Sequence, residues 1–135
     1  MSKLDELQLN KYTKDSNCRI EYTGEKRDCV AIYLTSNNLF FPHTEEMFWK
    51  AVVEKDRYEW TKQKISYVQK HIFLRDIYKQ WYASGINSTL DSIDKVVEWL
   101  KVEVKDYTRI VCLGSSGGGV FCEHPWSKIE SKLST

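Results

Sequence analysis

The stretch "RIVCLGSSGG", residues 109–118, carries an apolar run directly into a turn of serine and glycine. Four of the six glycines in the chain fall within the six positions from 114 to 119. Glycine adopts backbone conformations that other residues rarely reach, so it concentrates in sharp turns and where a backbone approaches a ligand. The stretch therefore predicts a strand that ends in a functional turn.

The spacing of these glycines separates three kinds of site. A P-loop needs a lysine near its end, but no lysine occurs in residues 107–126. The dinucleotide fingerprint, with glycines at its first, third and sixth positions, fits neither Gly114 nor Gly117 as its start. The pattern G-x-S-x-G fits residues 114–118 and makes Ser116 the nucleophile of a strained elbow after a strand. The alternative is a glycine turn without chemistry.

Two further apolar runs, residues 29–34 and 71–75, precede the run 109–113. Stretches with a helical pattern separate the three runs. This alternation predicts an α/β fold, a parallel sheet with flanking helices, whose loops gather at the carboxyl ends of the strands. The run 18–22 is interpreted as a hairpin partner of 29–34, because a short polar segment separates the two.

Capping residues and apolar spacing predict two helices. Thr44 is followed by two glutamates, which suit the positive end of a helix that extends through residue 55. Ser88 is expected to cap a second helix, whose apolar face continues through Leu100 and which ends near residue 104. The loops expected at one edge of the sheet are residues 36–42, 76–87 and 114–120.

Composition limits the class of protein. The chain has 135 residues, 41% of them apolar, which suits one domain with a real core. Its 20 basic and 19 acidic residues leave a net charge of +1, so no overall field favours nucleic acid. No apolar stretch is long enough to span a membrane. We expect a cytoplasmic protein with reduced thiols at Cys18, Cys29, Cys112 and Cys122.

Three motifs carry a resemblance to a known family. They are "SNN" at residues 36–38, where the family has "SSN", then "FLRD" with "WY" and "GI" in residues 73–86, and "GSSGG" at residues 114–118. With these motifs, residues 29–119 resemble the amino-terminal half of an α/β-hydrolase-fold protein, in particular a poorly characterised bacterial group with a GSSGG elbow. The resemblance covers about two thirds of the chain and implies a partial, Rossmann-like three-layer fold.

The resemblance also implies roles for individual residues. Ser116 would be the catalytic nucleophile, and the Gly117 backbone N–H would be one oxyanion donor. The second donor would come from Asn37 or Asn38, in the loop after the neighbouring strand. The alternative for the two asparagines is an ordinary turn.

Other residues are candidates for lining the same site. Asp76 follows a predicted strand, although a helix cap or a local ion pair is the more common role for such a residue. Trp81 and Tyr82 would form the wall of a pocket or belong to the core. His43 is considered as a base, against an ordinary histidine at the start of a helix.

The resemblance stops near Gly119. Members of this fold place the acid and then the histidine after the nucleophile, but only 19 residues follow Ser116. On a helix, His124 would lie about 12 Å from that serine, beyond hydrogen-bond reach. We therefore expect a truncated, frameshifted or fragmentary chain, with a polar segment at 1–17, an incomplete core at 18–119 and a divergent tail at 120–135.

Two functions follow from these observations. The first is a serine hydrolase scaffold of the esterase or acyltransferase type that acts on a small acyl or ester substrate and is weakly active or inactive. The alternative is a non-catalytic binding or remnant protein that retains the sheet. Neither requires a metal or a cofactor, and a sheet missing its later strands would self-associate through its exposed edge.

Overall fold

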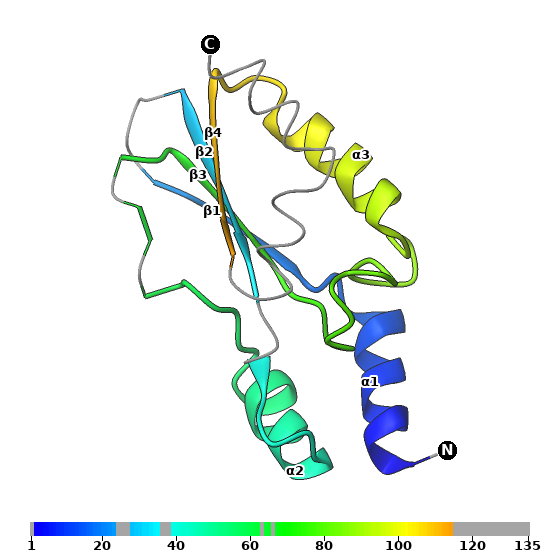
Figure 1. Cartoon of the computed structure of the whole chain (residues 1–135). Coiled ribbons are helices and arrows are strands. Elements are labelled where there is room, and N and C mark those ends of the chain that lie inside the picture. Colours follow the sequence, from blue (N-terminus) through cyan, green and yellow to red (C-terminus); the bar gives the residue numbers. More distant parts are fainter. Residues whose placement is uncertain (1, 24–27, 36–38, 63, 66, 115–135) are drawn as a thin grey trace.

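The computed structural model shows one mixed sheet packed against helices (Figure 1). It describes residues 2–23, 28–35, 39–62, 64–65 and 67–114. Its strands are β1 (Cys18–Tyr22), β2 (Cys29–Leu34), β3 (Lys70–Leu74) and β4 (Arg109–Gly114). Its helices are α1 (Lys3–Lys14), α2 (Glu45–Phe48), the π-helix η2 (Trp49–Glu54) and α3 (Ile93–Val104).

The three predicted parallel strands are neighbours, as expected. The strand order is β1-β3-β2-β4, and β2 pairs in parallel with β3 on one side and with β4 on the other. Leu34, at the end of β2, is in register with both Leu74 and Gly114. All six residues of β2 are buried, as its unbroken apolar run predicts for the centre of a sheet.

The position of β1 contradicts the sequence prediction. This strand pairs antiparallel with β3, with Cys18 opposite Leu74 and Tyr22 opposite Lys70, so it forms no hairpin with β2. Both sides of β2 are already occupied by parallel partners, so β1 cannot pair with it and lies instead on the outer side of β3. Its exposed Arg19 and Tyr22 suit an edge strand. The sheet is therefore mixed, and the prediction of a parallel sheet is wrong.

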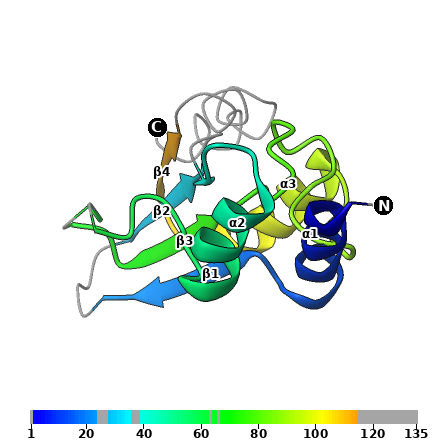
Figure 2. The ribbon, with the colours of Figure 1, turned by 90° about the horizontal axis from the view of Figure 1, so that it is seen from below.

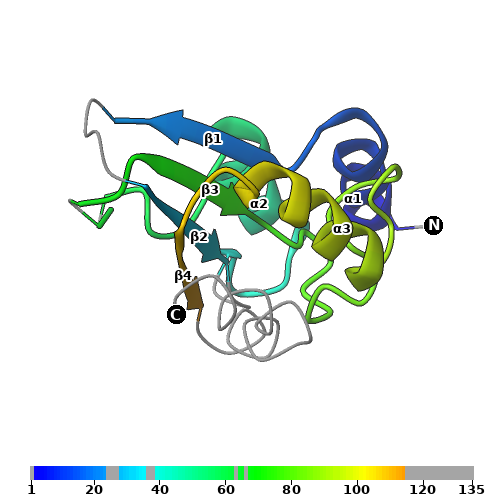
Figure 3. The same ribbon diagram turned by 90° about the horizontal axis from the view of Figure 1, so that it is seen from above.

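One face of the sheet is covered by α3 (Figure 3). Buried residues of this helix, including Val96, Leu100 and Val104, pack in one apolar cluster with Ile32 and Ile72 of the central strands. Burial of such aliphatic side chains contributes roughly 1.5–3 kcal/mol each. This half of the predicted architecture, a helix against the parallel strands, is confirmed.

The opposite face is covered by a loop. Tyr58, Trp60, Ile65 and Val68, between η2 and β3, pack with β-strand residues such as Phe73, and no helix covers this face among the residues that the structure describes. The backbone of Trp60 has a positive φ of 74°, which interrupts any helix. The predicted three-layer fold with helices on both faces is therefore wrong.

The remaining helices lie beyond the carboxyl ends of the parallel strands (Figures 1 and 2). There α1 and α2 contribute to an apolar cluster in which Leu4 and Leu7 contact buried residues such as Phe48 and Ile77. The sequence prediction contained no helix in the polar segment 1–17. A capping box begins α1, in which Asp5 N–H donates to Ser2 Oγ and Ser2 N–H donates to the Asp5 carboxylate.

Cap geometry tests the two predicted helix starts. Thr44 Oγ1 accepts a hydrogen bond from Met47 N–H at 3.2 Å, so the predicted start of α2 is confirmed. The start of α3 is not at Ser88, because Ser92 is the residue whose hydroxyl accepts from Lys95 N–H. The Asn87 side chain instead holds the segment before the helix in a turn, because its oxygen accepts hydrogen bonds from Thr89 N–H and Leu90 N–H.

Two further predictions meet the structure here. Cys18 and Cys29 are free thiols, whereas Cys112 is disulfide-bonded, so the expectation of four reduced cysteines is wrong for Cys112. Among the described residues, no helix combines the length and the apolar character that crossing a membrane requires.

Mutation can test whether Ser92, and not Ser88, caps α3. Ser92→Ala removes the acceptor of Lys95 N–H and should lower the free energy of unfolding by about 1 kcal/mol. Ser88→Ala is the matched control and should change it much less, since Ser88 is exposed and does not cap the helix. Urea unfolding followed by circular dichroism measures both, and a larger loss for Ser88→Ala would contradict the assignment.

Candidate functional site

The catalytic serine and oxyanion donors predicted from the sequence, Ser116, Gly117, Asn37 and Asn38, lie outside the described residues. The structure does describe the two strands that lead to them. Because β2 and β4 are adjacent and parallel, with Leu34 in register with Gly114, the chain leaves both strands at the same edge of the sheet. The candidate acyl-transfer site therefore begins from two neighbouring strand ends.

Asp76 organises the loop that follows β3. Its carboxylate accepts backbone hydrogen bonds from Tyr78 N–H at 3.0 Å, Gln80 N–H at 2.7 Å and Tyr82 N–H at 2.9 Å. Burial raises the pKa of the Asp76 carboxyl, although the three N–H donors favour its charged form. The side chain thus acts as a local cap, the alternative that the sequence left open.

The two aromatic residues of the same loop have different environments. Both have positive φ, 55° at Trp81 and 63° at Tyr82. The Tyr82 ring is buried in the core beneath α3, and its hydroxyl donates to Thr35 O at 3.0 Å. Trp81 is 56% exposed. Tyr82 therefore fastens this loop to the end of β2, and neither ring lines the large pocket described below.

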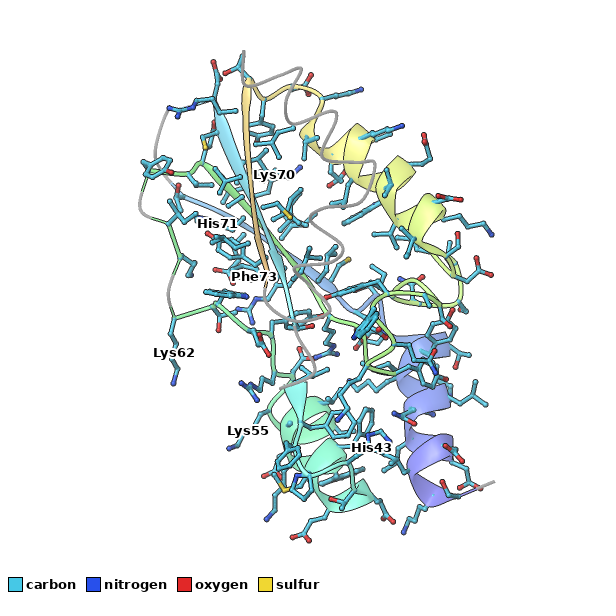
Figure 4. All side chains as sticks on the ribbon, in the orientation of Figure 1. His43, Lys55, Lys62, Lys70, His71 and Phe73 are labelled. Carbon is cyan, nitrogen blue, oxygen red and sulfur yellow. The ribbon has the colours of Figure 1, made fainter. Side chains whose placement is uncertain are left out.

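His43 lies just before α2. It is exposed, and its ring stacks on Phe40 with a centroid distance of 5.3 Å. Figure 4 shows it at the helical end of the molecule, by α1 and α2. It matches the helix-entry alternative of the sequence prediction, and its role as a base stays a prediction.

A buried hydrogen bond between a tyrosine and a histidine was not predicted from the sequence. Tyr33 Oη and His71 Nδ1 are 2.7 Å apart inside the sheet, and Tyr33 Oη also accepts from Ile65 N–H. Either the Tyr33 hydroxyl or an Nδ1–H group of His71 can donate in this bond, according to the tautomer of the ring. The Nε2 atom of His71 is buried without a hydrogen-bond partner among the described residues. Burial, and then the charge of Lys64, lower the pKa of His71.

A cavity lies on the loop-covered side of the sheet. It has a volume of about 700 Å³ and is called the basic pocket here. Four of its lining residues are aromatic: Phe40, Phe41, Tyr58 and Trp60. Its cationic lining residues are Arg19, Lys50, Lys55, Arg57 and Lys62.

Sequence reasoning missed this pocket, because its residues come from β1, from the α2 and η2 helices and from the loop after them. A signal existed in residues 55–62, "KDRYEWTK", where basic and aromatic side chains alternate. That signal becomes interpretable only when the sheet brings Arg19 to the same place.

The buried Arg75 lies beneath this pocket. Its guanidinium packs 4.4 Å from the centre of the Tyr58 ring, and its Nη1 is 2.8 Å from the Asp56 carboxylate. Its Nε donates to Asn17 Oδ1 at 2.9 Å. Arg75 thereby fixes both Tyr58 and the single acidic residue of the described pocket lining.

Neither metal ligation nor known relatives identify a site. Within the described ranges, no group of three or more histidine, cysteine, aspartate or glutamate side chains is arranged to hold a metal ion. Comparison with family models, with curated proteins and with solved structures finds no match to this chain. The function must therefore be argued from the residues themselves.

The role of Asp76 as a cap can be tested by a substitution that changes one acceptor oxygen into a donor. Asp76→Asn replaces a carboxylate oxygen with an N–H₂ group, which leaves at least one buried backbone N–H without an acceptor. The free energy of unfolding should fall by about 2 kcal/mol. The exposed Asp106→Asn is the control. Equal, small losses for both variants in urea unfolding would contradict the role of Asp76.

The buried His71 should make stability depend on pH. Because its folded pKa is lowered, the unfolded chain takes up a proton first as pH falls below the ordinary value of about 6.5. Stability should then decrease with falling pH, by at most about 1.4 kcal/mol per pH unit for one proton. Urea unfolding between about pH 7.5 and 5.5 should show a smaller decrease in His71→Gln than in wild type or His43→Gln. Identical slopes in all three would refute this.

Proposed function

We propose that the chain is a serine hydrolase scaffold of the esterase or acyltransferase type, with Ser116 as its nucleophile. The observation that carries the proposal is the parallel pairing of β2 with β4, in which Leu34 faces Gly114. A nucleophile elbow after one strand and an oxyanion donor after its neighbour need this adjacency. A sheet in which other strands separated β2 from β4 would have excluded it.

Chain connectivity limits how far the reacting groups can be from these strand ends. Ser116 is two residues beyond Gly114, so its Cα lies within about 7 Å of that glycine. Asn37 is two residues beyond Thr35 and is limited in the same way. The two segments thus have the reach to form an oxyanion hole, in which donors lie about 3 Å from the developing charge.

Activation of the serine is the weak part of the proposed chemistry. Ser116 Oγ would attack the acyl carbon and pass its proton to a base while the alcohol leaves. His71 is buried in the sheet and bonded to Tyr33, and Asp76 is bonded to backbone N–H groups. His43 and His124 remain as bases. We therefore propose low turnover of small acyl or ester substrates.

The other parts of this proposal follow from the same scaffold. We place the protein in the cytoplasm and propose that copies associate through the edge formed by β4. The resemblance to α/β-hydrolase-fold proteins stays a prediction. The alternative is a non-catalytic protein. It is favoured because the side chains of Asp76, Tyr82 and His71 already make hydrogen bonds within the fold.

A serine-directed fluorophosphonate separates the two readings. The wild-type chain should be labelled slowly, and Ser116→Ala should abolish the labelling because it removes the attacking oxygen. Ser115→Ala is the matched control and should retain it. Intact-protein mass spectrometry measures the adduct over time.

Labelling that persists in Ser116→Ala would contradict the assignment of the nucleophile. No labelling of the wild-type chain, even after long incubation, would favour the non-catalytic alternative. Fast labelling with a burst of product would instead show that a base is in place, and His43→Gln would then test whether His43 supplies it.

A further inference from the structure

Basic residues outnumber acidic residues in the described lining of the basic pocket. Asp56 is the only acidic residue among its described lining residues, and its carboxylate is already 2.8 Å from the buried Arg75. The carboxylate cannot therefore neutralise the lysines around it. In a partly enclosed site, an uncompensated group of cations attracts anions more strongly than the same charges on an open surface.

Two exposed lysines of the pocket lining, Lys55 and Lys62, are available to a ligand. Arg19 and Lys50 pair with carboxylates outside the lining, at 2.9 Å and 3.2 Å. Lys55 and Lys62 make no ion pair with any other residue that the structure describes. Figure 4 shows both lysines on the same side of the molecule, with their side chains directed away from the sheet.

The aromatic walls of the pocket are held in place before any ligand arrives. Trp60 Nε1 donates to Leu34 O at 3.3 Å, which fixes the indole against the end of β2. The Tyr58 ring rests on the Arg75 guanidinium. Phe41, by contrast, is 77% exposed, an unusual environment for a side chain with so much apolar surface. The walls thus offer fixed apolar surface beside exposed cations.

The backbone of the lining segment is also in an uncommon conformation. Asp56 and Trp60 have positive φ values of 47° and 74°. Residues other than glycine rarely adopt this region, and such conformations cluster at ligand sites, where the surrounding structure imposes them. Here the imposing contacts are the Asp56 ion pair with Arg75 and the Trp60 hydrogen bond to Leu34.

We propose that the basic pocket binds a small organic phosphate, in which a phosphate or diphosphate group is joined to an aromatic or apolar body. Lys55 and Lys62 would contact the phosphate oxygens, and Tyr58, Trp60 and Phe41 would contact the body. The volume of about 700 Å³ fits such a molecule. This proposal does not depend on Ser116 or on the hydrolase function.

A nucleic acid would also be attracted by cations next to aromatic rings. The structure favours a small molecule over such a polymer. The cations line one concave cavity of about 700 Å³, which suits a small molecule, and the net charge of +1 gives the chain no overall attraction for a polyanion. Binding of an oligonucleotide is therefore an outcome that would overturn the proposal.

Adenosine diphosphate, pyrophosphate and adenosine are suitable probes for calorimetric titration of the full chain. Adenosine diphosphate should bind saturably and more tightly than either pyrophosphate or adenosine, because it alone engages both the lysines and the aromatic walls. Raising sodium chloride from about 50 mM to about 300 mM should weaken the binding, since salt screens exposed charges.

The variants assign the binding to the pocket. Lys55→Gln with Lys62→Gln should weaken binding of adenosine diphosphate by about tenfold or more. Lys14→Gln with Lys105→Gln removes the same charge from exposed positions outside the described pocket lining and should change it less than about twofold. All four lysines are exposed, so both double variants should fold, which thermal unfolding checks.

Three results would overturn the proposal. They are no saturable binding of adenosine diphosphate or pyrophosphate to the wild-type chain, equal losses in the two double variants, and tighter binding of a short single-stranded oligonucleotide. Ser116→Ala should retain the binding of adenosine diphosphate. This result distinguishes failure of the pocket from failure of the hydrolase proposal.

Discussion

The rest of the structure depends on one buried cation, the guanidinium of Arg75. Its side chain is completely buried at the end of β3, which is costly unless carboxylates and carbonyl oxygens surround it. Those partners come from far apart in the sequence: Asn17 from the start of β1, Asp56 and the Arg57 carbonyl from the loop after η2, and the Asp15 carboxylate at 3.5 Å. Satisfying one charge therefore fixes where three segments meet.

Asn17 extends this constraint to the rest of the loops. Its side-chain oxygen accepts from Arg75, while its amide donates to the Lys11 carbonyl at the end of α1 and to the Ile86 carbonyl. Asp76, the next residue after Arg75, binds the backbone of the loop 76–82 in the same way. Buried polar networks of this kind are stable only when nearly every member has a partner, so they specify a single arrangement of the chain.

This dependence explains what could be predicted from the sequence. The central strands were predictable because their apolar runs reflect burial on both faces, which is a local signal. The Thr44 cap was equally local. The position of β1 was not, since it depends on which side of β3 is vacant and on Asn17 reaching Arg75. Pairing between distant segments leaves no mark in short windows of sequence.

The same reasoning applies to the missed helix and to the two candidate sites. The helix α1 is mostly polar, and its short apolar stripe, Leu4 and Leu7, is too weak a pattern to predict a helix. The stripe is explained only by its packing against the cluster that includes Phe48 of α2. The GxSxG pattern was readable because an elbow is built from consecutive residues. The basic pocket could not be predicted in this way, because Arg19 and Lys62 line the same pocket only when β1 pairs with β3.

One hydrogen bond connects the two sites. Trp60 donates to the carbonyl of Leu34, the residue of β2 that is in register with Gly114. The wall of the basic pocket thus rests on the end of β2, next to the end of β4, after which the proposed elbow would begin. A ligand that displaced Trp60 would free this carbonyl at the end of β2, where a buried acceptor without a partner is costly.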